Sequence, residues 1–167
     1  MTRKSKRLSK EEKIEVEEWI YQNNTEETRM TDTMTIRVKC KTENQKTLVN
    51  AIKEKEIIIC SGPAGTGKTF LACAEALRLI KRNSKYKKIV IVKSVTTLKN
   101  EEIGFLKGNL REKMEPFMFS FVHNFEKIVG QMITSRLREL KTIEELPIAY
   151  MRGINLDRSI IIIDEAQ

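Results

Sequence analysis

The chain has 167 residues, the size of one domain, and a formal net charge of +8. No apolar run approaches the roughly 18 residues of a membrane-spanning helix, and the charged N-terminus lacks the apolar stretch of a signal peptide. These features predict a cytoplasmic protein with no membrane segment. The three cysteines lie in apolar patterns without C-x-x-C spacing, so we expect reduced core residues at Cys40, Cys60 and Cys73.

Residues 1–33 are predicted to form a basic extension and linker ahead of a domain at 34–167. Capping-box spacing at Ser9 predicts a helix as far as about Asn23, followed by a polar linker. The extension concentrates positive charge at Arg3, Lys4, Lys6, Arg7 and Lys10. Such charge suits an acidic polymer such as RNA or DNA, while a disordered solubilising tail explains it equally well.

The domain begins with an alternating segment and a short helix. Apolar residues alternate with polar ones over Met34–Cys40, which predicts a strand with one exposed face. Thr42 to Gln45 has capping-box spacing and predicts the start of a helix. Gln45 has two interpretations: it caps that helix, or its amide reads an adenine edge by donating and accepting at once.

The central motif is Gly62-Pro63-Ala64-Gly65-Thr66-Gly67-Lys68-Thr69, which matches G-x-x-x-x-G-K-[ST] at every fixed position. An apolar strand is expected before it at Glu56–Cys60, and an apolar helix after it from Phe70. The glycines let main-chain N–H groups face a phosphate. Lys68 is expected to bind the β- and γ-phosphates as a catalytic residue, and Thr69 to bind Mg²⁺. We therefore expect a bound nucleotide to contact the whole stretch from Gly62 through Phe70.

Downstream of the loop helix, Lys88–Lys93 has an uninterrupted apolar centre, which predicts a strand covered on both faces in a parallel sheet. A long connection, Ser94 to Gly108, follows its carboxyl end, and such segments are usually functional or mobile. Asn109 to Lys141 is helical in pattern, with Pro116 expected to start or kink a helix. Apolar residues of this helix are expected to face the core, and His123 is interpreted as structural.

Two more core strands are predicted at Leu146–Tyr150 and Ser159–Ile163. The second leads into Asp164, the position of the Mg²⁺-holding carboxylate of P-loop enzymes. Glu165 is either a general base that polarises water or an acid that starts a helix. Strands that alternate with helices predict an α/β fold with a mostly parallel sheet.

With Gly104-Phe105-Leu106, Ala149 to Gly153 and Asp164 to Gln167 added to the loop, the chain resembles the PhoH-like family of P-loop ATPases, which is related to superfamily 1 helicases. The resemblance runs from about Thr42 to Gln167. It implies a three-layer P-loop NTPase fold, a Walker A loop at 62–69 and a Walker B pair at 164–165. It also implies an adenine-reading role for Gln45, the cofactors ATP and Mg²⁺, RNA- or DNA-related activity, and ring-shaped homo-oligomers.

Departures from that family pattern qualify the expected activity. Ser94-Val95 stand where relatives carry Arg-Pro, and Ile154 replaces an arginine, so two cationic contacts are expected to be missing or displaced to Lys93. In helicase-like relatives a further strand inserts between the loop strand and the Walker B strand. The sequence is therefore expected to be an incomplete domain without its C-terminal strands, and slow in hydrolysis. The alternative function is a nucleotide-binding module that does not hydrolyse ATP and acts by assembly with a partner.

Overall fold

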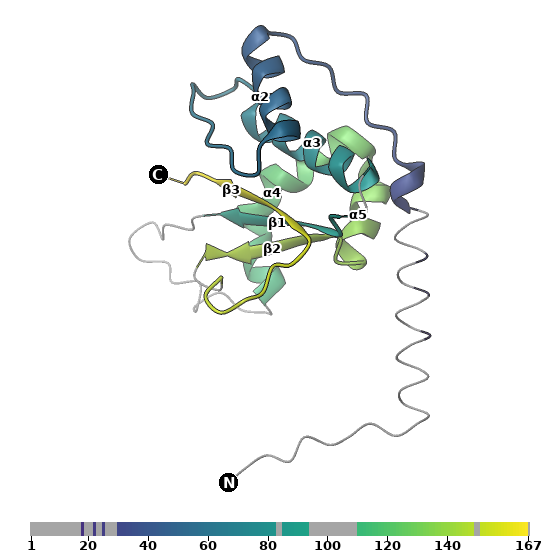
Figure 1. The fold of residues 1–167 in the computed structure, drawn as a ribbon. Helices are drawn as coiled ribbons and strands as arrows, with labels where there is room; N and C mark the ends of the chain where they lie inside the picture. The colour runs from purple at the N-terminus through teal and green to yellow at the C-terminus, as the bar shows by residue number, and fades with distance from the viewer. Residues whose placement is uncertain are drawn as a thin grey trace.

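The computed structural model describes Glu18, Gln22, Thr25 and residues 30–82, 85–93, 110–148 and 151–166, with backbone only at 110–118. Figure 1 shows helices packed beside a small sheet. The elements in chain order are α2 (Glu43–Glu54), α3 (Lys68–Arg82), β1 (Lys88–Lys93), α4 (Leu110–Val129), α5 (Gln131–Glu139), β2 (Ile143–Pro147) and β3 (Ser159–Asp164). The five cations of the extension and the connection at 94–108 lie outside the described residues. Residues 30–33, predicted as linker, are helical.

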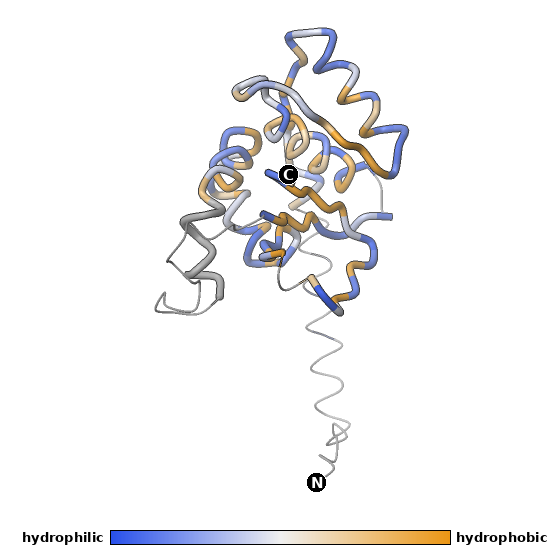
Figure 2. Tube along the Cα trace, turned by 90° about the vertical axis from the view of Figure 1, so that its left-hand side faces the viewer, coloured by the Kyte–Doolittle hydropathy of each residue, from blue (hydrophilic) through white to orange (hydrophobic). Residues whose placement is uncertain are grey.

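The sheet confirms the predicted α/β class. Its three described strands are parallel and lie in the order β2-β1-β3. β1 is central, and its four apolar residues, Ile89 to Val92, are fully buried, as the uninterrupted apolar run predicted. In Figure 2 the hydrophobic strands β1 and β3 run side by side.

The core joins the helices to one face of this sheet. On α3, Cys73 and Leu77 are one helical turn apart and both fully buried, and Phe121 and Phe125 repeat that spacing on α4. These side chains pack with residues of α5 and the strands, namely Leu137, Ile89, Ile91, Ile143, Ile160 and Ile162. The predicted apolar face of the long helical region is therefore confirmed at these positions.

The strand predicted at Met34–Cys40 is wrong, although its alternating burial is correct. The segment is extended but pairs with no described strand, and its inward residues Met34, Ile36 and Val38 pack on the core. Side chains of α3 satisfy its carbonyls instead: Arg78 donates to Val38 O (2.6 Å) and Lys81 donates to Met34 O (2.6 Å). These cations donate to carbonyls that would otherwise need a neighbouring strand. The alternating burial of the segment is therefore kept although the segment pairs with no described strand.

The strand predicted at Glu56–Cys60 is also wrong. No described strand pairs with it, and the side chains of Ile57 and Ile59 are 85% and 94% exposed. An apolar run forms a strand only where a neighbour accepts its main-chain hydrogen bonds, and none of the described residues does so here. Cys60 is consequently exposed rather than in the core, whereas Cys73 is buried and Cys40 is half-buried.

The region predicted to be helical, Asn109 to Lys141, contains two helices, α4 and α5. α4 continues through Pro116, which neither starts nor ends it, and the break falls at Gly130, where φ is 90°. A left-handed φ suits glycine and ends the helical path of α4. His123 is exposed on α4 and stacks on Phe119, with ring centroids 5.9 Å apart.

β2 begins earlier than predicted, at Ile143 instead of Leu146. The sequence pattern did not predict this start because two glutamates lie at the centre of the strand. Both are paired with cations. Glu144 accepts from Lys88 (2.8 Å) and Glu145 accepts from Arg138 (2.8 Å). The ion pairs allow carboxylates inside a partly buried strand.

Candidate functional site: a glycine loop beside the end of β3

The glycine loop leads directly into the first turn of α3, as the motif predicted. Gly65 and Gly67 have φ values of 74° and 84°, which are left-handed and favour glycine. Thr66 Oγ1 donates to the Pro63 carbonyl (3.0 Å), and Leu71 N–H donates to the Gly67 carbonyl (2.9 Å) as α3 begins. The loop thus places a helix N-terminus and several main-chain N–H groups together, the usual arrangement for binding an anion.

Lys68 folds back over this loop. Its Nζ donates to the carbonyls of Gly62 and Pro63, both at 2.8 Å. The ammonium is therefore held by two main-chain oxygens at the mouth of the loop. A polyphosphate that enters the loop offers the same ammonium a charged acceptor, which makes a stronger hydrogen bond than a carbonyl.

The loop is joined to the end of β3 by a contact between residues 95 positions apart. Thr69 Oγ1 donates to Asp164 Oδ1 at 3.0 Å. Asp164 is the last residue of β3, and the register pairs it with Lys93 at the end of β1. The structure therefore gathers one hydroxyl, one carboxylate and one further cation at the carboxyl edge of the parallel sheet, where ligands of open α/β sheets bind.

The chemistry of this pair fits Mg²⁺. A hydroxyl and a carboxylate are hard oxygen ligands, and Mg²⁺ in nucleotide sites takes one or two protein ligands and completes its shell with water and phosphate. The described residues contain no cluster of three or more His, Cys, Asp or Glu side chains able to hold a metal. Thr69 and Asp164 would therefore hold the ion together with the oxygens of a bound polyphosphate.

Cys73 is a neighbour of this pair that sequence reasoning did not connect with it. It lies one helical turn after Thr69 and is completely buried. Burial, with a further contribution from the negative charge of Asp164, raises the pKa of the Cys73 thiol from 9.0 to about 12. The thiol stays protonated at neutral pH, so it is a packing residue and not a nucleophile. Its spacing of four residues from Thr69, one helical turn, is the sequence feature that could have placed Cys73 beside this pair.

The remaining predicted site residues lie in different surroundings. Gln45 reaches the loop and donates to the Thr66 carbonyl. Phe70 is half-buried and packs against the core. Glu165 follows β3 with a left-handed φ of 53° and an exposed side chain. These placements leave the roles of Phe70 and Glu165 as predictions.

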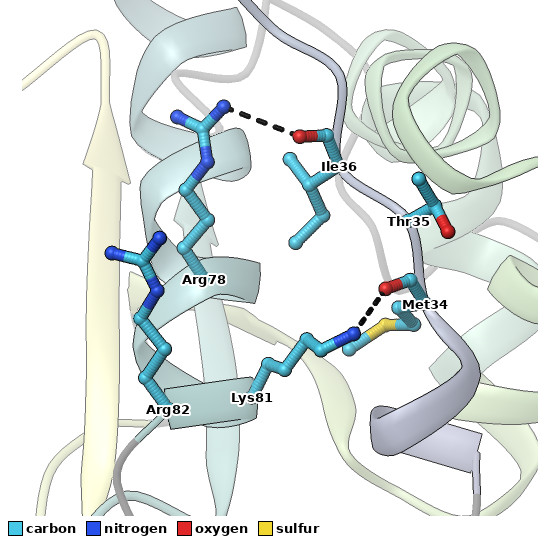
Figure 3. Close-up of a pocket in the computed structure, with 6 residues that line it drawn as sticks. All are labelled: Met34, Thr35, Ile36, Arg78, Lys81 and Arg82. Carbon is cyan, nitrogen blue, oxygen red and sulfur yellow. Dashed lines mark hydrogen bonds between the residues drawn. The ribbon is translucent and has the colours of Figure 1, made fainter.

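A separate pocket of about 250 Å³ lies on the flank of α3 and is shown in Figure 3. Its lining residues are Met34, Thr35, Ile36, Arg78, Lys81 and Arg82. Arg78 is ten residues after Lys68, or about 15 Å along the helix, so this pocket is not the phosphate site. Arg78 also pairs with Glu75, a carboxylate that is 1% exposed. The pocket therefore lies between the extended segment and α3, where hydrogen bonds hold the two together.

Among the described residues no helix is long and apolar enough to cross a membrane. A family profile described as PhoH-like protein matches residues 37–167 of the chain.

Individual relatives carry related names. A PhoH-like protein of Bacillus subtilis is 37% identical over 161 residues, which cover 96% of this chain and 49% of that protein. A PhoH-like protein of Synechocystis is 36% identical over 78% of this chain and 39% of its own length. Protein PhoH of Escherichia coli K12 is 31% identical over 75% of this chain and 35% of its own length. The chain thus spans about half or less of these relatives. The Bacillus match also extends into residues 1–33, which the motifs had left outside the resemblance.

Proposed function

Because the chain belongs to the PhoH-like family, we propose that it binds ATP with Mg²⁺ in the loop from Gly62 to Thr69 and hydrolyses it. The observation that supports the proposal is the 3.0 Å contact between Thr69 and Asp164, which joins the glycine loop to the carboxylate at the end of β3 across 95 residues. Bound Mg²⁺ would supply charge neutralisation for the phosphates. Lys68 would exchange its two loop carbonyls for phosphate oxygens.

Binding is tested by calorimetric titration of Mg-ATP into the wild-type chain and into Lys68→Ala, Thr69→Ala and Asp164→Ala. Hydrogen bonds to charged groups contribute about 1.5–3 kcal/mol, so each variant should bind roughly 10- to 100-fold more weakly. Matched controls that should bind as the wild type does are Lys53→Ala, Thr47→Ala and Asp157→Ala, which are all exposed. In EDTA, Asp164→Ala should bind at least as well as the wild type, because a carboxylate no longer repels the phosphates. A wild-type chain that binds no nucleotide at millimolar concentration would overturn the proposal.

We assign Glu165 the role of orienting and polarising the attacking water. Glu165→Gln should keep nucleotide affinity while losing phosphate release, and full activity of this variant would refute the assignment. If the wild type binds ATP and releases no phosphate, the alternative of a non-hydrolysing module that assembles with a partner is supported instead.

A role in RNA or DNA metabolism and assembly into rings are further parts of the proposal. The net charge of +8 favours an acidic polymer as partner. Single-stranded RNA or DNA should accelerate phosphate release at low salt, and the effect should fall steeply as salt rises. Light scattering with and without nucleotide measures assembly.

A further inference from the structure

Gln45 connects the start of α2 to the phosphate loop. Its side-chain Nε2 donates to the Thr66 carbonyl at 3.0 Å, and its Oε1 accepts from the Lys41 main-chain N–H at 2.6 Å. The cap of α2 is a different residue, Thr42, whose Oγ1 accepts from the Gln45 main-chain N–H at 3.3 Å. The amide of Gln45 is therefore engaged with the main chain on both sides, and one partner lies 21 residues further along.

The contact with Thr66 has a consequence for the next residue. The Thr66 carbonyl and the Gly67 N–H belong to one planar peptide, and the described chain contains no cis peptide bond. In a trans peptide these two groups point in opposite directions. A hydrogen bond that fixes the carbonyl toward Gln45 therefore fixes the Gly67 N–H away from it. Glycine at 67, with φ of 84°, does not restrict this peptide by itself.

We propose that Gln45 is a positioning residue for the phosphate loop: it holds the Thr66–Gly67 peptide in the orientation that presents the Gly67 N–H to a polyphosphate. The inference rests on the proposed function, since it takes the loop as the phosphate site. It assigns the effect of Gln45 to the phosphates and not to the base. Its amide keeps one lone pair and one N–H beyond these contacts, so adenine reading is a separate role with a different signature.

Three ligands distinguish the two roles: ATP, GTP and inorganic tripolyphosphate, each titrated with Mg²⁺ into the wild type and Gln45→Ala by calorimetry. Loss of one neutral hydrogen bond that orients the loop should weaken all three by a similar factor, roughly 3- to 10-fold. Because tripolyphosphate has no base, its affinity distinguishes positioning of the loop from reading of the adenine. If Gln45→Ala binds tripolyphosphate as tightly as the wild type, the inference is overturned, whatever happens to ATP.

Two variants control for the helix. Thr42→Ala removes the cap of α2 and leaves the Gln45 amide, so its tripolyphosphate affinity should stay within about 2-fold of the wild type. Gln45→Asn keeps an amide but is one methylene shorter, so it should weaken tripolyphosphate as Gln45→Ala does. Equal weakening in Thr42→Ala would assign the effect to the helix and refute positioning by the amide.

A further measurement requires no ligand. The amides of β1 should exchange with solvent equally in the wild type and in Gln45→Ala, which shows that the fold of the variant is intact. If the wild type binds none of the three ligands, the proposed function fails and the inference with it. If the wild type binds them and only the Gln45 effects are absent, the inference alone fails.

Discussion

The buried thiol of Cys73 gives this protein a pH dependence on the alkaline side. The pKa of its thiol is raised to about 12 in the folded chain, against 9.0 in an unfolded one. Stabilisation by the protonated thiol is complete below pH 9 and is lost as the pH rises toward 12, because the unfolded chain releases this proton first. The full pKa difference corresponds to roughly 4 kcal/mol in the free energy of unfolding.

This prediction is checked by urea denaturation between pH 8 and about pH 11. The wild type should lose stability faster with rising pH than Cys73→Ala, and the difference between the two curves isolates the thiol from lysines and tyrosines. Cys60→Ala is the matched control, since that cysteine is exposed and its removal should leave the wild-type slope. Parallel curves for wild type and Cys73→Ala would contradict the assigned pKa.

Among the secondary-structure elements, the apolar segment before the loop contributes little to stability. Ile59 is 94% exposed, whereas Ile91 in β1 is 1% exposed. Ile91→Ala should cost roughly 2–5 kcal/mol, and Ile59→Ala at most about 0.5 kcal/mol. Chemical denaturation of the two variants measures both values. Equal losses would mean that the segment packs in solution as the strand that its sequence predicted.

Loss of the contacts that hold the extended segment on α3 should lower the free energy of unfolding much more. Removal of Arg78 leaves the buried Glu75 without its cation and the Val38 carbonyl without a donor. A buried charge that loses its partner typically costs about 3–5 kcal/mol. Arg78→Ala should show this loss in a denaturant titration, and adding Glu75→Gln should restore part of it.

Arg82→Ala serves as the control for that experiment, because Arg82 is an exposed arginine of the same helix. Its stability should stay within about 0.5 kcal/mol of the wild type. A loss as large as that of Arg78→Ala would attribute the effect to the general charge of the helix end.

Sequence patterns were sufficient where a single residue type decides the local structure. Gly65 and Gly67 have the left-handed angles that the motif requires, and the apolar run of β1 is buried at the centre of a parallel sheet. Patterns failed where a distant partner decides. Ile57 and Ile59 resemble a strand but lack a described neighbour, and Glu144 is tolerated in β2 because Lys88 pairs with it. The contact between Gln45 and Thr66 likewise depends on how α2 docks, which spacing does not encode.

For the molecule as a whole, ligand binding and folding should be coupled. A ligand that binds only the folded chain stabilises it by about 2.7 kcal/mol at a concentration of 100 times its Kd. Mg-ATP at that excess should raise the melting temperature of the wild type, and Thr69→Ala at the same concentration should show a smaller rise. If Mg-ATP leaves the melting temperature of the wild type unchanged, the folded state described above does not bind the nucleotide preferentially.

The Lys68 ammonium already donates to the Gly62 and Pro63 carbonyls. Under the proposed function, a ligand would have to replace both of these hydrogen bonds. A neutral nucleoside or a singly charged anion would do so poorly and a multivalent phosphate chain well, so the loop would select ligands by their charge, independently of the base.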